Sequence, residues 1–474
     1  MAFVSRRHFL SGAGALSFTA GIGALSSMTA GKSWAANVSG YKALVCVCLK
    51  GGMDQADTIL PFDQSSYNEL ARVREELFEA YDSTSVSSSR NRNNLLKLNP
   101  VNPDQVGGRE LAMPRELSAL HTMFEDGDLA LLGNVGPLIE PTSRAQLESN
   151  TAILPARLFS HNDQRSTWMA FGVEGERRGW GGLFADAVLA SSPSADPAFV
   201  SVSATSNDVF LSGDVATPFR VSSNGAARPD LVNQGKYLGF DPADDEARAL
   251  IREHLAQTEF NHRNIFAQDI QTSAGRAIEA SDRLLLAREN QEPFATEFGS
   301  DNFGQQLKSV AETIKIQSYL NAPRQIFYVS SGGFDTHDNQ AGTLGDRHSE
   351  IANAIAAFKA AMTEIGQWDN TVVFTMSDFG RTLIGNGDGT DHGWGGHQFI
   401  VGGQVNGKRL YGDFPAAEPG SRFYTPSRGR LIPTTAVEQY AASLGRWFGL
   451  TNAELAAALP NLGNFDHSDL GFLG

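Results

Sequence analysis

Short apolar runs alternate with longer helical patterns along most of the chain, and this alternation restricts the fold more than any other feature. The runs predicted as strands are residues 42–49, 128–135, 198–203, 325–330, 371–376 and 398–402. The segments predicted as helices are residues 181–190, 244–257, 264–288, 303–321, 345–368 and 433–448. Strands that are apolar almost throughout are typical of parallel sheets with both faces buried. The pattern therefore predicts an α/β fold with a mostly parallel central sheet.

The composition indicates a globular protein. Of the 474 residues, 41% are hydrophobic and 19% are charged, so the chain can bury a large core without disulfide bonds. This length predicts one large domain or two closely packed ones. The 53 acidic residues outnumber the 38 basic ones, and the net charge of −15 argues against a general nucleic-acid-binding protein, because the phosphate backbone favours Lys and Arg.

The N-terminal segment, residues 1–36, has the features of an export leader. Arg6 and Arg7 precede Phe and Leu, and an uncharged stretch of small and apolar residues covers positions 12–30. This order is typical of a twin-arginine signal peptide, and Ser33 and Ala35 fit the small-x-small cleavage rule. A membrane anchor is the alternative, but the stretch is weakly hydrophobic for a span. We therefore expect residues 1–36 to engage the twin-arginine export machinery. Residues 37–474 would then form a periplasmic or secreted protein with no stable membrane span.

Two stretches of the mature chain are predicted to be insertions. Residues 83–103 are rich in Ser, Asn and Arg and are expected to form a surface loop. Residues 241–294 are dense in charge and helical in pattern, so we expect a helical insertion that covers one side of the sheet. Cys46 and Cys48 lie two residues apart in the first predicted strand, and this spacing favours two buried thiols over a strained bridge.

Polar side chains follow the predicted strands where each one ends. Gly51 and Gly52 follow the first strand and precede Asp54, and a second Gly-Gly pair precedes Asp335 and His337. Ligands in parallel α/β sheets bind at the carboxyl ends of the strands, where carboxylate and imidazole groups can hold a metal ion. The alternative for Asp54 is a turn or helix cap, and for the second cluster a solvated loop.

A third cluster follows the strand at residues 371–376. Asp378 and Arg381 come first, and a glycine-rich loop then carries Asp391, His392 and His397. No amphipathic pattern would bury these two histidines in a core, so we interpret them as ligands. Arg381 could bind an oxyanion through two parallel hydrogen bonds.

These strand ends together predict a one-metal or two-metal hydrolytic site. Oxygen and nitrogen ligands without Cys suit Zn, Mn, Mg or Ca, and the spacing does not choose among them. The proposed metal ligands are Asp54, Asp335, His337, Asp378, Asp391, His392 and His397. Ser160 is either a nucleophile or the N-cap of the helix that follows it.

The order of these motifs resembles an exported family, domain of unknown function 1501, from about residue 41 to residue 449. The motifs are Gly51-Gly52-x-Asp54, Ser160-His161, Gly333-Phe334-Asp335-Thr336-His337, Ser377-Asp378-Phe379-Gly380-Arg381-Thr382, Thr390-Asp391-His392-Gly393 and Tyr411-Gly412-Asp413. That family belongs to the alkaline-phosphatase-like superfamily of phosphatases, sulfatases and phosphopentomutases. The resemblance implies a three-layer sandwich, with helices on both faces of a mostly parallel sheet.

The resemblance also implies roles for single residues. Asp54 corresponds to the first metal aspartate of the superfamily, and Asp335 and His337 to the Asp and His that bind one ion. Asp378 corresponds to the Asp of an Asp-His pair, in which Phe379 replaces the His. The late His ligand is His392 or His397. Ser160 is the best match for the nucleophile, with Thr142 and Ser143 as rivals.

Two hypotheses of function follow. The first is an exported metal-dependent hydrolase of small anionic phosphate or sulfate esters, in which Ser160 attacks and Arg381 holds the oxyanion. The second is an exported binding or assembly protein without catalysis, which keeps the scaffold and one metal ion. Phe379 favours the second hypothesis, and the clustered Asp and His residues favour the first.

Overall fold

The computed structural model describes residues 35–84, 89–222, 225–226, 249–250, 253, 265–289, 291–466 and 468–474. Residues 1–34 of the predicted leader lie outside the described residues, as does most of the predicted helix at 244–257. Within the described ranges, no helix combines the length and the apolar character that crossing a membrane requires.

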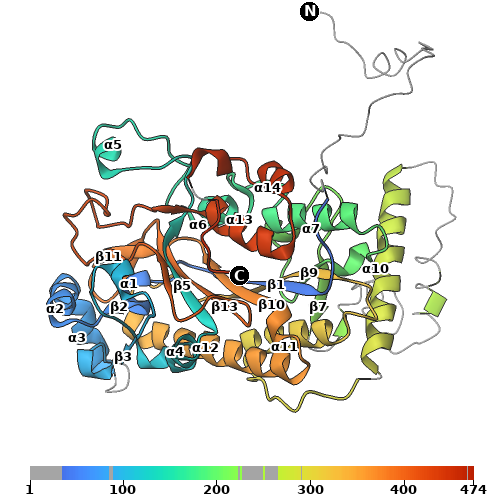
Figure 1. Cartoon of the computed structure of the whole chain (residues 1–474), viewed down its shortest axis with the longest axis horizontal. Coiled ribbons are helices and arrows are strands. Elements are labelled where there is room, and N and C mark those ends of the chain that lie inside the picture. The colour runs from blue at the N-terminus through green and yellow to red at the C-terminus, as the bar shows by residue number, and fades with distance from the viewer. Residues whose placement is uncertain are drawn as a thin grey trace, which may run out of the picture. The chain divides into compact units, whose positions relative to one another are not determined.

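A ten-stranded mixed sheet forms the centre of the described chain (Figure 1). Its order is β14 (Leu410–Gly412), β5 (Leu129–Gly136), β13 (Gly396–Gly402), β10 (Thr371–Ser377), β1 (Lys42–Leu49), β9 (Arg324–Ser331), β6 (Ser201–Ser203), β7 (Phe219–Ser222) and β8 (Gly225–Ala226), with β15 (Thr435–Ala436) paired to β5. Strand β13 is antiparallel to both of its neighbours and β8 to β7, while the other pairs are parallel. The prediction of a mostly parallel sheet is confirmed.

Strand β1 lies in the middle of the sheet because its side chains are apolar on both faces. Alternate residues point to opposite faces of a strand. One set joins the core beneath the sheet, namely Ala43, Val45, Val47 and Leu49. The other set joins the core above it, namely Leu44, Cys46 and Cys48. Both cysteines are free, buried thiols, as expected, and burial raises the pKa of Cys48 to about 12.

Helices cover both faces of the sheet, so the predicted three-layer arrangement is confirmed (Figure 1). The helices on one face are α4 (Ser118–Asp126), α11 (Asn302–Lys315) and α12 (Gln340–Glu364), whose buried side chains join one core. Those on the other face are α6 (His161–Ala170), α7 (Trp180–Ser191), α13 (Val437–Phe448) and α14 (Asn452–Ala458), whose side chains join the second core.

The remaining elements form loops, hairpins and coverings around these layers. They are α1 (Gln55–Thr58), β2 (Leu60–Pro61), α2 (Gln64–Val73), α3 (Glu75–Thr84), β3 (Leu96–Lys97), β4 (Leu111–Met113), α5 (Arg144–Glu148), α10 (Ile265–Glu289), β11 (Arg381–Gly385) and β12 (Thr390–His392). Helix α10 lies within the predicted insertion and buries Ala280 and Leu284 in the core that α11 and α12 share.

The prediction of a surface loop at residues 83–103 is wrong for four of its side chains. Ser89, Arg90, Leu95 and Leu98 are all less than a tenth exposed. Arg90 forms a buried ion pair with Asp57, with 2.7 Å between Nε and Oδ1. One charged residue of this polar segment therefore forms an internal salt bridge. The sequence pattern had predicted a segment exposed to solvent.

Candidate metal centre

Three neighbouring parallel strands, β10, β1 and β9, end at the same level of the sheet. Leu49 at the end of β1 pairs with Ser377 of β10 and with Ser331 of β9. The loop after β1 runs directly against the loop after β9. Gly51 permits this contact, because its φ is +116° and a Cβ there would lie 2.4 Å from the backbone nitrogen of Asp335. The topology thus gathers the loops that carry the predicted site residues.

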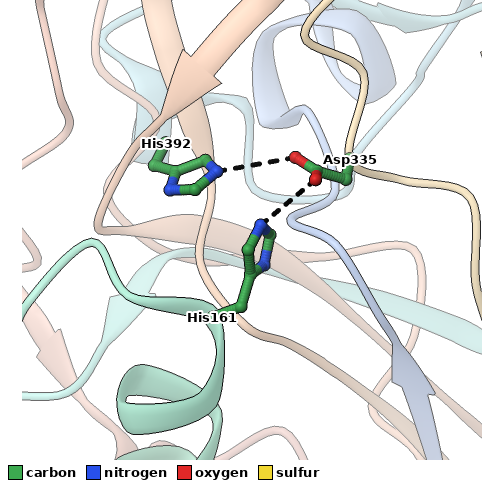
Figure 2. A group of neighbouring side chains, drawn as sticks. All are labelled: His161, Asp335 and His392. Carbon is green, nitrogen blue, oxygen red and sulfur yellow. Dashed lines mark ion pairs between the residues drawn. The ribbon is translucent and has the colours of Figure 1, made fainter.

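Three imidazole rings converge on one carboxylate at this edge. Figure 2 shows His161 and His392 facing the carboxylate of Asp335, with Nε2 of His161 3.3 Å from Oδ2 and Nε2 of His392 3.5 Å from Oδ1. Nε2 of His337 lies 3.2 Å from the same Oδ1 and 2.8 Å from Nε2 of His392. The ligand atoms of His161, Asp335 and His392 all lie within 4.8 Å of one another.

The outer nitrogens of two of these rings are held by acceptors. Nδ1 of His392 lies 2.8 Å from the carbonyl oxygen of Phe159, which can only accept, so this Nδ1 carries the hydrogen. Nδ1 of His161 lies 2.8 Å from Oδ2 of Asp378, and an ionised carboxylate likewise only accepts. Each Nε2 then presents a lone pair toward Asp335. This is the tautomer of a metal-binding histidine with an outer acceptor.

The third ring has a similar arrangement at longer range. Nδ1 of His337 lies 3.3 Å from Oδ1 of Asp391. Lone pairs on two Nε2 atoms 2.8 Å apart, beside a carboxylate, repel each other unless a proton or a cation lies between them. Nε2 of His161 is also buried without a hydrogen-bond partner among the described residues. The ligand atoms of His161, Asp335 and His392 therefore fit a divalent cation, and His337 lies beside them.

Burial and neighbouring charge favour the neutral form of two of the imidazoles, those of His337 and His392. Desolvation is the main cause that lowers the pKa of His337 and of His392, and the charge of Arg381 lowers both further. Burial raises the pKa of Asp335, but the hydrogen bond from Arg381 and the nearby charges outweigh it and hold this pKa below its usual value. Neutral rings beside an ionised carboxylate are the protonation states that a metal requires.

Arg381 positions Asp335 and is not free to hold an oxyanion, contrary to its predicted role. The guanidinium is fully buried. Its Nη1 donates to Oδ1 of Asp335 at 3.0 Å and to the carbonyl oxygen of Gly51 at 3.1 Å. Its Nε donates to Oγ1 of Thr390 at 3.2 Å, and its Nη2 to the carbonyl oxygen of the same residue.

Asp54 is not brought to the group, contrary to its predicted role as a ligand. Its side chain is buried and pairs with Arg74, with 2.6 Å between Oδ2 and Nη1 and 2.9 Å between Oδ1 and Nη2. Gln340 donates to Oδ2 at 2.8 Å, and the backbone nitrogen of Ala56 donates to Oδ1 at 3.1 Å. Both oxygens are thus occupied, and Asp54 caps helix α1. This agrees with the helix-cap alternative.

His397 is also outside the group. Its Nδ1 accepts a hydrogen bond of 3.0 Å from the backbone nitrogen of Asn134, and its ring packs on Phe414 at 4.7 Å between centroids. Burial is the main cause that lowers the pKa of His397 to about 3. The ring is therefore neutral and acts as a core acceptor, although the sequence around it suggests a ligand.

Asp378 and Asp391 lie behind the imidazoles, where Asp378 is hydrogen-bonded to His161 and Asp391 lies 3.3 Å from Nδ1 of His337. Ser160 occupies the N-cap position of α6, but its hydroxyl donates to Oδ2 of Asp163 at 2.9 Å and does not cap the helix. Of the rival hydroxyls, that of Ser143 is used in the capping box of α5, and that of Thr142 donates to the carbonyl oxygen of Glu140.

His161 is the site residue that sequence reasoning missed. It is the first residue of helix α6 and directly follows Ser160, the predicted nucleophile of the same motif. One turn later on the same helix lies Arg165, a partly exposed cation whose Nη1 is 3.9 Å from Oδ1 of Asp378. A signal existed for His161, because a polar helix start without an apolar face is a poor place for a core histidine.

Phe379 closes the floor of the site where the superfamily pattern expects a histidine. Its ring centroid lies 4.8 Å from that of His161 and 4.6 Å from that of His392. It also packs on the loop after β1, where a Cβ on Gly52 would lie 2.5 Å from the aromatic ring. Because this ring offers no ligand atom, the described side chains around it provide ligands for one ion, in the group formed by His161, Asp335 and His392.

Comparisons with known proteins give several distant structural neighbours and one family. The chain is similar to solved structures of the PsFucS1 sulfatase from Pseudoalteromonas sp. (8% identity, 87% of this chain and 68% of that chain, TM-score 0.34) and a 2-O GAG sulfatase (10% identity, 87% and 71%, TM-score 0.28). It is also similar to a mutant of the alkaline phosphatase PafA (12% identity, 73% and 64%, TM-score 0.24). No curated protein sequence matches it. A family model described as "Protein of unknown function (DUF1501)" matches residues 41–454, so the chain belongs to that family.

Proposed function

We propose that this protein is an exported, metal-dependent hydrolase of phosphate or sulfate esters. One observation carries the proposal, namely the convergence of three Nε2 atoms on Asp335 with an acceptor behind each ring. The Nε2 atoms of His337 and His392 lie 2.8 Å apart, a separation that needs either a shared proton or a cation between them, and the proposal is that a cation takes this place. A bound divalent cation would supply Lewis-acid polarisation of an ester oxygen.

The donor set favours zinc among the metals considered. His161, His337 and His392 offer nitrogen, and Asp335 offers oxygen. Magnesium and calcium prefer all-oxygen shells, whereas imidazole nitrogen suits zinc. A zinc ion with four protein ligands is typical of a structural site. A zinc ion with three protein ligands has a fourth coordination position that substrate can occupy. His337 is the most exposed of the three rings, with 43% of its side chain accessible, and is the ligand most readily displaced by substrate.

Ser160 is the proposed nucleophile. Its hydroxyl donates to the carboxylate of Asp163, which can accept the proton as the oxygen attacks. It stands at the start of the ten-residue helix α6, where the helix dipole favours the negative charge of a phosphate or sulfate group. Arg165, on the same helix, supplies a positive charge for the anion and takes the role that was predicted for Arg381.

A second candidate is a binding or assembly protein in which the ion is structural. The packing of Phe379 beneath His161 and His392 favours it, because an aromatic ring in this place replaces the imidazole that the resemblance implies directly after Asp378. The two candidates differ in one respect that can be measured. If the ion is structural, its removal destabilises the fold and there is no turnover to lose. If the ion is catalytic, its removal lowers both stability and turnover.

Metal analysis and an ester panel test the proposal. The mature protein is expected to hold about one zinc per chain. His392→Ala should lose zinc, together with hydrolysis of aryl phosphate or sulfate esters, while His121→Ala on α4 should lose neither. Ser160→Ala should retain zinc and lose turnover. Zinc that stabilises the fold with no turnover across the panel would favour the structural ion, and absence of zinc would refute both candidates.

Export by the twin-arginine pathway is part of the proposal. It is supported by the Arg6-Arg7 pair, the weakly hydrophobic stretch at positions 12–30 and the small residues that follow. The double variant Arg6→Lys and Arg7→Lys should remain in the cytoplasm at full length. Export of this variant at the level of the unsubstituted protein would contradict the assigned route.

A further inference from the structure

The backbone nitrogen of Ala36 lies between two acceptors. Oγ of Ser191 at the end of α7 is 2.9 Å away, and Oε1 of Glu454 on α14 is 3.1 Å away. Ala36 is only 7% exposed. An amide nitrogen carries a single hydrogen, so it can satisfy only one of these acceptors well, whereas an ammonium group carries three.

The chain is tied to the folded body from this residue onward. The nitrogen of Asn37 donates to the carbonyl oxygen of Gly449 at 2.8 Å. Buried Arg324 of β9 donates from Nη2 to the carbonyl oxygens of Asn37 and Ser39, at 2.9 and 3.0 Å. Ala35, by contrast, is exposed. The change from an exposed to a buried residue therefore falls at the bond between Ala35 and Ala36.

The sequence places a leader-cleavage signal at the same bond. Ser33 and Ala35 stand three and one residues before it, as the small-x-small rule requires. The predicted leader boundary at residue 36 lies one residue later. Cleavage at 35/36 adds one water across the peptide bond, which leaves a carboxylate on Ala35 and an α-amino group on Ala36. With an ordinary pKa of about 7.7–8.0, that group is mostly protonated at neutral pH.

We infer that the leader is removed between Ala35 and Ala36 and that the new ammonium group of Ala36 docks between Ser191 and Glu454. The carboxylate of Glu454 is already oriented for this, because its Oε2 accepts from the nitrogen and the hydroxyl of Thr451 at 2.7 Å each. The bond from the nitrogen of Thr451 is one half of the capping box of α14, whose other half runs from the nitrogen of Glu454 to Oγ1 of Thr451, and Oε1 is left for the N-terminus. The inference rests on the expected export leader and is independent of catalysis.

The N-terminal residue of the exported protein is the first test. Sequencing and intact mass should show a chain that begins at Ala36. A chain that begins at Asn37 or at any other residue, or that keeps its leader after export, overturns the cleavage site.

The second test measures the docked charge. Glu454→Gln keeps an N3 residue able to form the capping box, removes the negative charge and replaces one carboxylate oxygen by an NH2 group, and this loss of an acceptor is common to the cleaved and the leader-bearing forms. The substitution should lower the melting temperature of the cleaved protein about 2 °C more than that of the leader-bearing Arg6→Lys and Arg7→Lys variant, because only the former carries an ammonium group at Ala36. Glu148→Gln on α5 is the control. Equal losses in the cleaved and leader-bearing forms overturn the docking.

Discussion

A buried carboxyl group in helix α13 should make the stability of this protein fall as the pH rises toward neutrality. Glu438 is only 1% exposed, in the first turn of the helix. Its Oε1 accepts from Nδ2 of Asn461 at 2.8 Å, and its Oε2 has no partner among the described residues. It borders a pocket of about 220 Å³ that is lined mainly by apolar side chains such as Leu138 and Val173.

The size and sign of the effect follow from the pKa of this group. Burial raises the pKa of Glu438 from 4.5 to about 7. Between these two values the folded chain keeps a proton that the unfolded chain has released, so stability falls with rising pH in this window and is constant above it. Roughly 1.4 kcal/mol for each pKa unit gives about 3 kcal/mol, as an upper estimate.

Glu438→Gln removes the charge and retains an oxygen that can accept from Asn461. Urea unfolding should show the variant more stable than the unsubstituted protein by about 1–3 kcal/mol at pH 8, and nearly equal to it at pH 4.5. Glu148→Gln, whose parent side chain is 51% exposed, is the matched control and should show no such dependence. A difference between Glu438→Gln and the unsubstituted protein that is the same at both pH values would refute the reasoning.

Three further substitutions test the site and its support. Arg74→Met should lower the free energy of unfolding by about 3–5 kcal/mol, since it leaves a fully buried carboxylate without its partner; a loss below about 1 kcal/mol in urea would contradict this. Gly51→Ala should weaken zinc binding in a chelator competition, because its Cβ would lie 2.4 Å from the nitrogen of Asp335, whereas Gly40→Ala, with nothing within 4 Å, should not. Asp378→Asn should lower zinc affinity about 10–100-fold, and an unchanged affinity would remove this carboxylate from the site.

Much of the fold was predictable because burial on both faces leaves a strong pattern. The β1 segment is apolar at almost every position, and its predicted bounds, residues 42–49, are those of the strand. The same pattern marked the strand ends, so Asp335, His337 and His392 were found from their places after glycine-rich turns. Parallel strands guarantee that such turns meet at one edge.

The directions of individual side chains were not predictable in the same way. Asp54 and His397 follow glycine-rich turns just as Asp335 does, but distant groups decide where they point. Arg74 comes twenty residues after Asp54 and binds both of its oxygens. The acceptor role of His397 depends on the backbone of Asn134, 263 residues away. No local pattern encodes such pairings.

The position of β1 in the sheet has a consequence for the order of events during synthesis. Its two partners, β9 and β10, are the two strands that complete the centre of the sheet, and Ser377 of β10 lies 328 residues after Leu49. At about 5–20 residues per second, roughly 15–65 s pass between the synthesis of β1 and that of β10. Until β9 is made late in this interval, one of the most apolar segments of the chain has neither of its two partner strands. The centre of the sheet therefore cannot form until β9 and β10 have emerged. Until then, the nascent chain depends on protection from aggregation.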